Sequence, residues 1–392
     1  MNQEKKEEQK ENIRLGDLLL IILVSFLLLA VGVALCLLPP SELSERENRR
    51  LQPWTVPTAE SLLSGRYAEE LRLACVDQFP LREQIVTWKA TAEKALGFGE
   101  NHGVLFGKDG YLIPRYKTND ESVLEKNIEA MDGFSETIAE QGIPTFGLFA
   151  PRSADIMTER LPALYRRVAD LGAEERLLAT IQNRPFEAVL PRELLRQAAE
   201  GRQTQYRTDH HWTTYGAYLS YCALMEQMGI EPYEESFFRI ERVSDDFLGS
   251  FYAKAGGVAD RTDTVALYRY EGDGGFVIRN EETGERLDGF YDESALSGSD
   301  HYRVFLGGNY GRITICDPSA ERPRLLLIKD SYANCLIPFL ALHFDLDVID
   351  LRYYPKSLSA LLEENDHDLA LFVQGVSTLL DDPALARLRG TR

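Results

Sequence analysis

The feature that most constrains this chain is an uncharged run near its start. Residues 18–38 read LLLIILVSFLLLAVGVALCLL. About 20 apolar residues in an α-helix reach across the roughly 30 Å hydrocarbon core of a bilayer. A core helix of a soluble protein normally keeps one polar face, which this run lacks. The run therefore predicts a transmembrane anchor over residues 18–38.

A cleaved signal peptide is the main alternative to an anchor. Signal peptides usually have a shorter apolar region followed by a small-residue cleavage site, and the sequence ALCLLPPSE offers no such site. Basic residues lie on both sides of the run, with a slight excess before it, which favours a cytoplasmic N-terminus. We therefore expect residues 1–17 to be a cytoplasmic tail without regular structure. The rest of this single-pass chain is expected on the extracytoplasmic side of the cell membrane.

Composition excludes some functions. The 392 residues carry a formal net charge of −19, whereas nucleic-acid binding needs a basic surface. One of the five cysteines lies in the predicted anchor, and the others are widely spaced. That spacing matches neither a zinc site nor a dense disulfide framework.

The region after the anchor divides into two parts. Residues 39–100 read as a stalk with a helical lead-in, whose helical spacing is broken at DQFPLRE. Residues 101–392 read as one large domain. Its first half predicts a hairpin, three helices and two strands, at 103–114, 121–141, 145–150, 173–183, 186–190 and 191–199. This alternation favours an α/β layer structure. Residues 238–318 are rich in Gly and Asp and predict a β-rich insertion.

The C-terminal stretch gives the clearest fold signal. Buried strands are predicted at 324–328, 346–351 and 369–373, with helices at 333–344, kinked at Pro338, and at 357–364. Strand-helix-strand repeats of this kind form a parallel sheet with right-handed crossovers. Function gathers at the carboxyl ends of such strands. The residues expected there are Lys329, Asp330, Ser331, Arg352 and Gln374.

Ser331 follows the first of these strands and precedes a predicted helix. A hydroxyl at this turn is exposed at the sheet edge, beside helix N–H groups that can stabilise an oxyanion. The same position also suits a simple helix cap, for which serine is a favoured residue. The stretch alone leaves both interpretations open.

A second candidate is the run TDHHWTTYGAY at residues 208–218, which enters a helix predicted from Thr214 to Met228. Asp209 and His211 are two residues apart, so both can point to the same side of an extended turn. Asp209 could then fix the tautomer of His211 and leave Nε2 free as a base. His210 is expected to face away, and Trp212 to pack against the following helix.

Two other interpretations use the same residues. Two imidazoles and a carboxylate are reasonable ligands for zinc or iron, although adjacent histidines rarely converge on one ion and no further His or Cys cluster completes the set. A polar turn anchored by Trp212 is the plain structural alternative. The two motifs together favour a Ser-His-Asp triad, because a triad is defined by geometry and not by sequence order.

Several segments also carry a family resemblance. The chain resembles the DHHW protein family, named for the run at Asp209–Trp212, and more distantly the SGNH-hydrolase-like alginate O-acetyltransferases of the extracytoplasmic side. The resemblance covers most of the chain beyond the anchor. Its blocks are SERENRRLQPW, DQFPLRE, GVLFGKDGYLI, FLGSFYAKAG and IKDSYANCLIPFL.

The resemblance implies a three-layer SGNH-like α/β fold and O-acetyl transfer to a cell-surface or secreted polysaccharide. By position, Ser331 is the implied nucleophile, His211 the base and Asp209 its partner. No metal or other cofactor is implied. The implied partner is a multi-spanning membrane O-acyltransferase that passes acetyl groups across the bilayer.

This sequence departs from the pattern in two ways. Lys329 replaces the glycine of the Gly-Asp-Ser motif, and the motif order is permuted relative to ordinary SGNH hydrolases. Candidate oxyanion or substrate contacts are Arg352, Asn309, Asn334 and Tyr332. Two alternatives to the transferase remain: a carbohydrate acetyl esterase with the same triad, and a non-catalytic glycan-binding or assembly protein of the cell envelope.

Overall fold

The predicted anchor lies within the first helix, α1 (Asn2–Leu37). The computed structural model describes residues 2–44, 47, 49–116, 121–167, 172–181, 184–364 and 366–391. Within α1, Leu15–Leu37 is long and apolar enough to span a membrane. The expectation that residues 1–17 lack regular structure is wrong, because α1 begins at Asn2. The run before the anchor is rich in Glu, Lys and Gln, which are strong helix formers.

Residues 1–92 and 93–392 form two compact units. In the first, β1 (Leu43–Ser44) pairs with β2 (Arg49–Arg50), and three helices follow: α2 (Ala59–Leu63), α3 (Arg66–Asp77) and α4 (Arg82–Ala95). The predicted break at DQFPLRE separates α3 from α4, where Leu81 takes a left-handed φ of 57°. Arg49 closes this unit by donating from both terminal nitrogens to the Asp77 carboxylate, at 2.9 and 2.7 Å.

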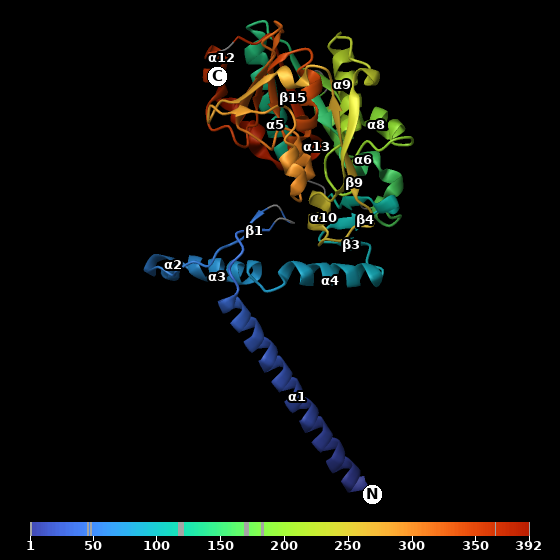
Figure 1. Ribbon diagram of the computed structural model, residues 1–392, viewed down its shortest axis with the longest axis vertical. Helices are drawn as coiled ribbons and strands as arrows, with labels where there is room; N and C mark the ends of the chain where they lie inside the picture. Colours follow the sequence, from blue (N-terminus) through green and yellow to red (C-terminus); the bar gives the residue numbers. More distant parts are fainter. Residues whose placement is uncertain are drawn as a thin grey trace. The chain divides into compact units, whose positions relative to one another are not determined.

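The main sheet of the second unit has eight strands within the described residues, in the order β11-β10-β12-β14-β13-β15-β6-β7. Figure 1 shows one of them, β15, among the helices of that unit. Strands β14 through β7 in that order run parallel, as the C-terminal pattern predicts, whereas β12, β10 and β11 join antiparallel. Their bounds are β6 (Thr145–Ala150), β7 (Glu187–Val189), β10 (Val277–Asn280), β11 (Arg286–Leu287), β12 (Arg312–Cys316), β13 (Arg324–Lys329), β14 (Asp345–Ile349) and β15 (Leu369–Gly375).

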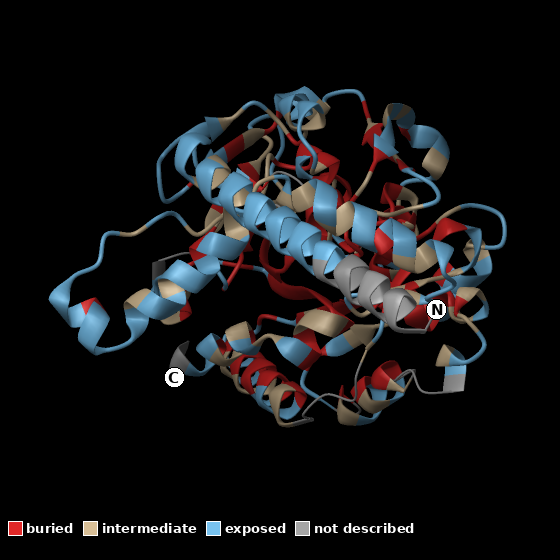
Figure 2. Cartoon of the chain, turned by 90° about the horizontal axis from the view of Figure 1, so that it is seen from below, coloured by how far each residue is buried: buried red, intermediate tan, exposed pale blue. Residues whose placement is uncertain are grey.

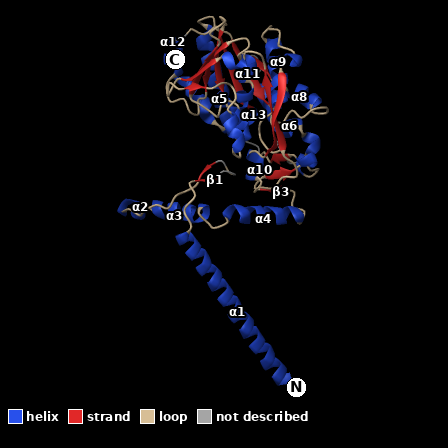
Figure 3. Ribbon diagram, viewed as in Figure 1, coloured by secondary structure: helices blue, strands red, loops and turns tan. Residues whose placement is uncertain are grey.

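Helices cover both faces of this sheet (Figure 3). Successive residues of a strand point to opposite faces. Leu325 and Leu327 of β13 therefore join one core cluster, while Leu326 and Ile328 join the other. The first cluster includes residues of α6 (Ser153–Ile156), α8 (Arg192–Ala198), α9 (Thr214–Gln227) and α11 (Ile337–Leu340), and the second those of α5 (Glu121–Ala139), α7 (Ala173–Ile181), α12 (Leu358–Glu364) and α13 (Val376–Asp381). Buried residues concentrate between these layers (Figure 2), so the fold is a three-layer α/β sandwich.

The section at residues 238–318 is β-rich, as predicted, but it is not a separate layer. Three of its strands, β10, β11 and β12, extend the main sheet. The remaining pair, β8 (Arg239–Phe247) and β9 (Asp263–Arg269), forms a two-stranded sheet with α10 (Ser250–Lys254) between its strands. The predicted hairpin at 103–114 is also present, as β4 (Val104–Phe106) and β5 (Leu112–Pro114) beside β3 (Glu100–Asn101).

The helix predicted at residues 333–344 is shorter than expected. A 3₁₀ turn spans Ser331–Cys335, and α11 follows with Pro338 in its first turn. Proline has no N–H to donate and a fixed φ, so it suits a helix start and does not act here as a mid-helix kink. Ser331 is thereby held in a tight turn at the carboxyl end of β13.

Candidate active site

The turn that presents Ser331 is held by Asp330. One carboxylate oxygen accepts from the Tyr332 amide at 2.9 Å, which caps the 3₁₀ turn. The other accepts from the Gly375 amide at 2.8 Å and from Thr378 Oγ1 at 2.6 Å, at the end of the neighbouring strand β15. Asp330 therefore fastens the serine turn to the adjacent strand, and the half-buried Ser331 side chain remains at the sheet edge.

The loop that carries the two histidines is closed by backbone bonds before α9 begins. The Tyr206 amide donates to the His211 carbonyl at 3.1 Å, and the Thr213 amide to the Thr204 carbonyl at 2.9 Å. Thr213 then caps α9, because its hydroxyl accepts from the Gly216 amide. These two backbone hydrogen bonds and the Thr213 cap therefore fix the conformation of the loop.

The fold brings Asp209, His211 and Ser331 together, although 120 positions separate the last two. His211 Nε2 lies 2.9 Å from Ser331 Oγ, and His211 Nδ1 lies 2.6 Å from Asp209 Oδ1. The Ser250 amide donates to Asp209 Oδ2 at 2.8 Å, which orients the carboxylate. Because an ionised carboxylate only accepts, the proton of neutral His211 sits on Nδ1 and leaves Nε2 as an acceptor facing the hydroxyl. This is the geometry of a nucleophile, its base and an orienting acid.

Burial and charge set the protonation of this group. Burial and the neighbouring His210 lower the pKa of His211 to about 4, against the opposing effect of Asp209, so the imidazole is neutral at physiological pH. Burial alone raises the pKa of Asp209, but the two adjacent imidazoles outweigh it and hold that pKa well below its usual range. A neutral base beside an ionised carboxylate is the state that proton abstraction requires.

Two aromatic side chains hold the site, and sequence reasoning missed one of them. The Tyr302 ring stacks on the His211 imidazole, with centroids 3.7 Å apart and planes 7° apart, and its hydroxyl donates to the Ser331 carbonyl at 3.0 Å. Trp212 is buried in the same core cluster as residues of α9, and its indole Nε1 donates to the Tyr332 carbonyl at 3.0 Å and to Cys335 Sγ at 3.2 Å. Both rings therefore brace the serine turn against the histidine loop.

His210 does not face away from the site, contrary to expectation. Its ring centroid lies 3.7 Å from that of His211, and its Nδ1 lies 2.8 Å from Ser250 Oγ. Backbone closure of the loop holds both rings on one side of an irregular turn. His210 nevertheless makes no hydrogen bond to Ser331 and keeps 39% of its side chain exposed.

Three of the other candidate contacts, Asn309, Asn334 and Arg352, form a network around Lys329 and Asp350, whereas Tyr332 lies against the histidine loop. Lys329 is buried, and its ammonium donates to Asn334 Oδ1 at 2.7 Å and to Asn309 Oδ1 at 3.1 Å. Burial lowers its pKa to about 8 despite the nearby Asp350 carboxylate. Arg352 binds the same Asp350 with two hydrogen bonds, at 2.9 and 2.7 Å. The lysine that replaces glycine thus ties the ends of β13 and β14 together.

Among the four weaker candidates, exposure separates Asn309 and Arg352 from the rest. Tyr332 and Asn334 are buried and engaged: the Tyr332 hydroxyl donates to the His210 carbonyl, and the Asn334 amide to Asn309 Oδ1. Asn309 is exposed, and its amide nitrogen donates to no acceptor within the described part of the chain. Arg352 keeps 28% of its side chain exposed.

Asp209, His210 and His211 could in principle hold a metal ion, because one ligand atom of each lies within 4.8 Å of the others. The contacts fit hydrogen bonding better. Two ligands of a tetrahedral zinc at about 2.0–2.1 Å stand about 3.3 Å apart, whereas Asp209 Oδ1 and His211 Nδ1 are 2.6 Å apart. Both ring nitrogens of His211 also face protein partners already.

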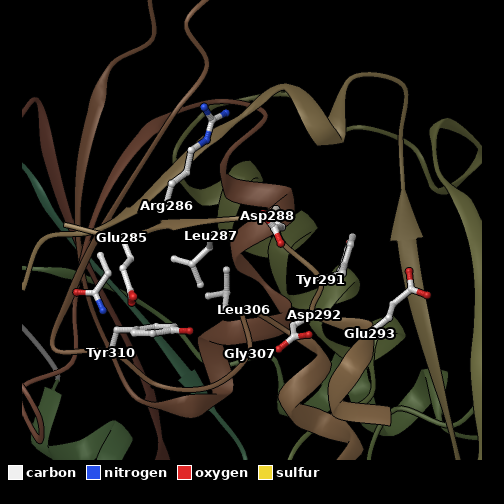
Figure 4. A pocket seen from close by; sticks show the side chains of 12 residues that line it. Glu285, Arg286, Leu287, Asp288, Tyr291, Asp292, Glu293, Leu306, Gly307 and Tyr310 are labelled. Atoms are coloured by element: carbon white, nitrogen blue, oxygen red, sulfur yellow. The ribbon is translucent and has the colours of Figure 1, made fainter. Parts of the chain in front are cut away.

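An open cleft of about 570 Å³ lies along the segment Leu306–Tyr310, which also carries Asn309 (Figure 4). Its lining combines two tyrosines with four acidic residues and one arginine: Tyr291, Tyr310, Glu285, Asp288, Asp292, Glu293 and Arg286. Because Asn309 contacts Lys329, this cleft and the serine turn are connected through one loop.

Comparison with known proteins confirms the resemblance stated from the motifs. The DHHW protein family model matches residues 178–349, and a model described as SGNH hydrolase-like domain, acetyltransferase AlgX, matches residues 104–244. A DHHW family protein from Eubacterium siraeum is 21% identical, with a TM-score of 0.63 over 74% of this chain and 96% of that one.

Bacillus cereus PatB1 gives a similar result. It is 21% identical, with a TM-score of 0.61 over 72% of this chain and 98% of that one, and it has also been solved with a sulfonyl adduct. At this identity the likeness shows the fold alone, and the family model for residues 104–244 describes that fold as SGNH hydrolase-like. No curated protein sequence matches this chain.

Proposed function

We propose that this chain is a membrane-anchored extracytoplasmic O-acetyltransferase that acts on a polysaccharide through Ser331, His211 and Asp209. The observation that carries the proposal is the unbroken hydrogen-bonded line from Asp209 through His211 to Ser331, at 2.6 and 2.9 Å. The match to the acetyltransferase AlgX family model supports acetyl as the transferred group.

The first half of the reaction loads the serine. Ser331 Oγ attacks the acetyl carbonyl carbon of a donor ester while His211 Nε2 takes the hydroxyl proton. The tetrahedral intermediate collapses when the bond to the donor oxygen breaks, and His211 returns the proton to that oxygen. Asp209 keeps the imidazole in the correct tautomer and stabilises its transient positive charge. We assign Asn309, with its uncommitted amide, as the oxyanion donor to be tested first.

The second half transfers the acetyl group. A glycan hydroxyl gives its proton to His211 Nε2 and attacks the acetyl-serine carbonyl, and the departing Ser331 oxygen takes the proton back. The tyrosine-containing cleft beside Leu306–Tyr310 supplies the acceptor surface. Its carboxylates repel a uronate polymer, so we assign a neutral or amino-sugar glycan as the acceptor.

The proposed setting follows from α1 and from the family resemblance. The anchor places residues after 38 outside the cell, and a multi-spanning O-acyltransferase supplies acetyl groups through the membrane. Protease added to intact protoplasts should remove the region after residue 40. Protection of that region would overturn the proposed location.

The experiment that tests the activity uses the full chain in detergent and a sulfonyl fluoride or fluorophosphonate probe. Labelling of Ser331 is expected, with loss of labelling in Ser331→Ala and His211→Ala but not in Ser297→Ala, a surface serine control. A folded protein that is never labelled would support the binding-protein alternative. Mass spectrometry of products from p-nitrophenyl acetate with chitooligosaccharides then separates acetylated glycan, for the transferase, from free acetate alone, for the esterase.

A further inference from the structure

The helices of the first unit expose an apolar stripe. On α4, Ile85 and Trp88 are 42% and 64% exposed, and Leu81, just before the helix, is 61% exposed. With Ala92, these positions recur every three or four residues and so lie on one face of the helix. The buried residue of the helix is Ala90, on another side. This stripe is therefore not the face on which α4 packs within its unit.

Val76 near the end of α3 and Phe79 just after it extend the apolar stripe. Val76 and Phe79 are 50% and 40% exposed. They border an apolar cleft of about 450 Å³ that also touches α4. Its lining residues are Cys75, Val76, Phe79, Arg82, Ile85 and Val86. Because Arg82 is paired with Glu47 at 2.8 Å, the one cation of this lining is neutralised.

The amino-acid composition of this exposed apolar face indicates the environment in which it lies. It combines Trp, Phe, Leu and Ile with flanking Lys89 and Arg72, the residue set of helices that lie in a membrane interface. The segment 59–95 carries five basic and six acidic residues, so apolar burial and not net charge would drive binding. The same compact unit contains α1, the helix that can span a bilayer.

We propose that the face formed by Val76, Phe79, Leu81, Ile85 and Trp88, here the interfacial face, lies in the headgroup boundary of the bilayer that α1 enters. The aromatic and aliphatic side chains enter the acyl region, and the cleft between α3 and α4 receives lipid chains. This inference rests on the proposed anchor and is independent of acetyl transfer.

Tryptophan fluorescence tests the inference in the full chain. The three tryptophans are Trp54, Trp88 and Trp212, and α1 contains none. In Trp54→Phe, the emission comes from Trp88 and from Trp212, which is fully buried and serves as an internal control. In phosphatidylcholine vesicles with brominated acyl chains, Trp88 emission should be lost, and aqueous iodide should not reach it.

A matched pair of variants adds a charge on and off the face. Ile85→Glu should restore Trp88 emission in brominated vesicles and expose it to iodide. Thr91→Glu, which adds the same charge at an exposed position beside the stripe, should leave the quenching intact. Both variants should still float with vesicles because α1 is unchanged.

Three outcomes would overturn the inference. In the first, the protein floats with vesicles, but its Trp88 emission survives the brominated chains and is quenched by iodide. The interfacial face would then lie in water. Protection from both quenchers places protein on the face. Failure to float removes the anchor and this inference with it, whereas the probe labelling of Ser331 still judges the acetyl-transfer proposal separately.

Discussion

Gly249 offers a test of the proposed triad that leaves Asp209, His211 and Ser331 themselves unchanged. A Cβ built at Gly249 would stand 2.3 Å from Asp209 Cβ and 2.4 Å from Asp209 Oδ2, whereas ordinary contact begins at 3.4 Å. The backbone at Gly249, with φ −92°, is open to alanine, so the effect of a methyl group is steric. In Gly249→Ala the Asp209 side chain must therefore shift by about 1 Å, which changes its distances to His211 and to the Ser250 amide.

A displacement of this size has calculable consequences. A misplacement of about 1 Å in a catalytic group can cost roughly 10²-fold in rate. We expect kcat/KM for p-nitrophenyl acetate to fall by about that factor in Gly249→Ala. Overpacking of the buried loop should also cost about 1–3 kcal/mol, lowering Tm by a few degrees.

The control for this prediction is Gly298→Ala, where the nearest atom to a new Cβ is the Ala295 carbonyl at 3.5 Å. That variant should keep both its rate and its Tm. If Gly249→Ala is folded by circular dichroism and hydrolyses the ester at the wild-type rate, the position of Asp209 does not matter. The argument for a triad would then be refuted.

Three further predictions concern His211 as the proposed base, the Tyr302 ring that stacks on it, and a distant carboxyl group. Since the pKa of His211 is about 4, kcat/KM should stay constant as pH falls through 6 and decline only near about pH 4, measured by ester hydrolysis. Tyr302→Phe keeps the ring stack but loses the bond to Ser331, so a loss of about 10-fold or less is expected, and Tyr302→Ala should lose more. Burial and the Asp155 charge raise the pKa of Glu174 to about 8. The folded state then holds a proton that the unfolded state releases, so urea-unfolding stability should fall as pH rises from about 4.5 to about 8, and Glu174→Gln should flatten that dependence.

The parallel half of the sheet could be predicted because its signal is local. Strands β13, β14 and β15 are short apolar runs between polar turns, and both of their faces are buried in the structure. The eight-strand order could not be predicted in the same way. It depends on β12 pairing antiparallel with β14, where Arg312 lies opposite Ile349, and no local pattern encodes a contact between such distant segments.

The candidate site likewise has a part that local sequence predicts and a part that only the tertiary fold creates. Asp209, His211 and Ser331 could be named because each sits in a short motif whose residue types carry chemistry. Tyr302 could not, because its neighbours suggest only a β-rich section and its stacking on His211 arises from the tertiary fold. The helix predicted after Ser331 was too long for a related reason. The Asp330 cap holds a 3₁₀ turn directly after β13, and Pro338 lies in the first turn of a separate short helix.

The segment from Tyr302 to Tyr310 runs from the candidate active site to the cleft that we propose as the acceptor surface. At one end Tyr302 contacts both His211 and Ser331, and further along Asn309 contacts Lys329, two positions before Ser331. Its last residues line the cleft of Figure 4. An acceptor bound in that cleft would therefore press on the loop that braces the base. Substitution of Tyr310, which lines the cleft, should alter acceptor choice before it alters ester hydrolysis, because the bonds that fix Asp209, His211 and Ser331 to one another do not pass through that residue.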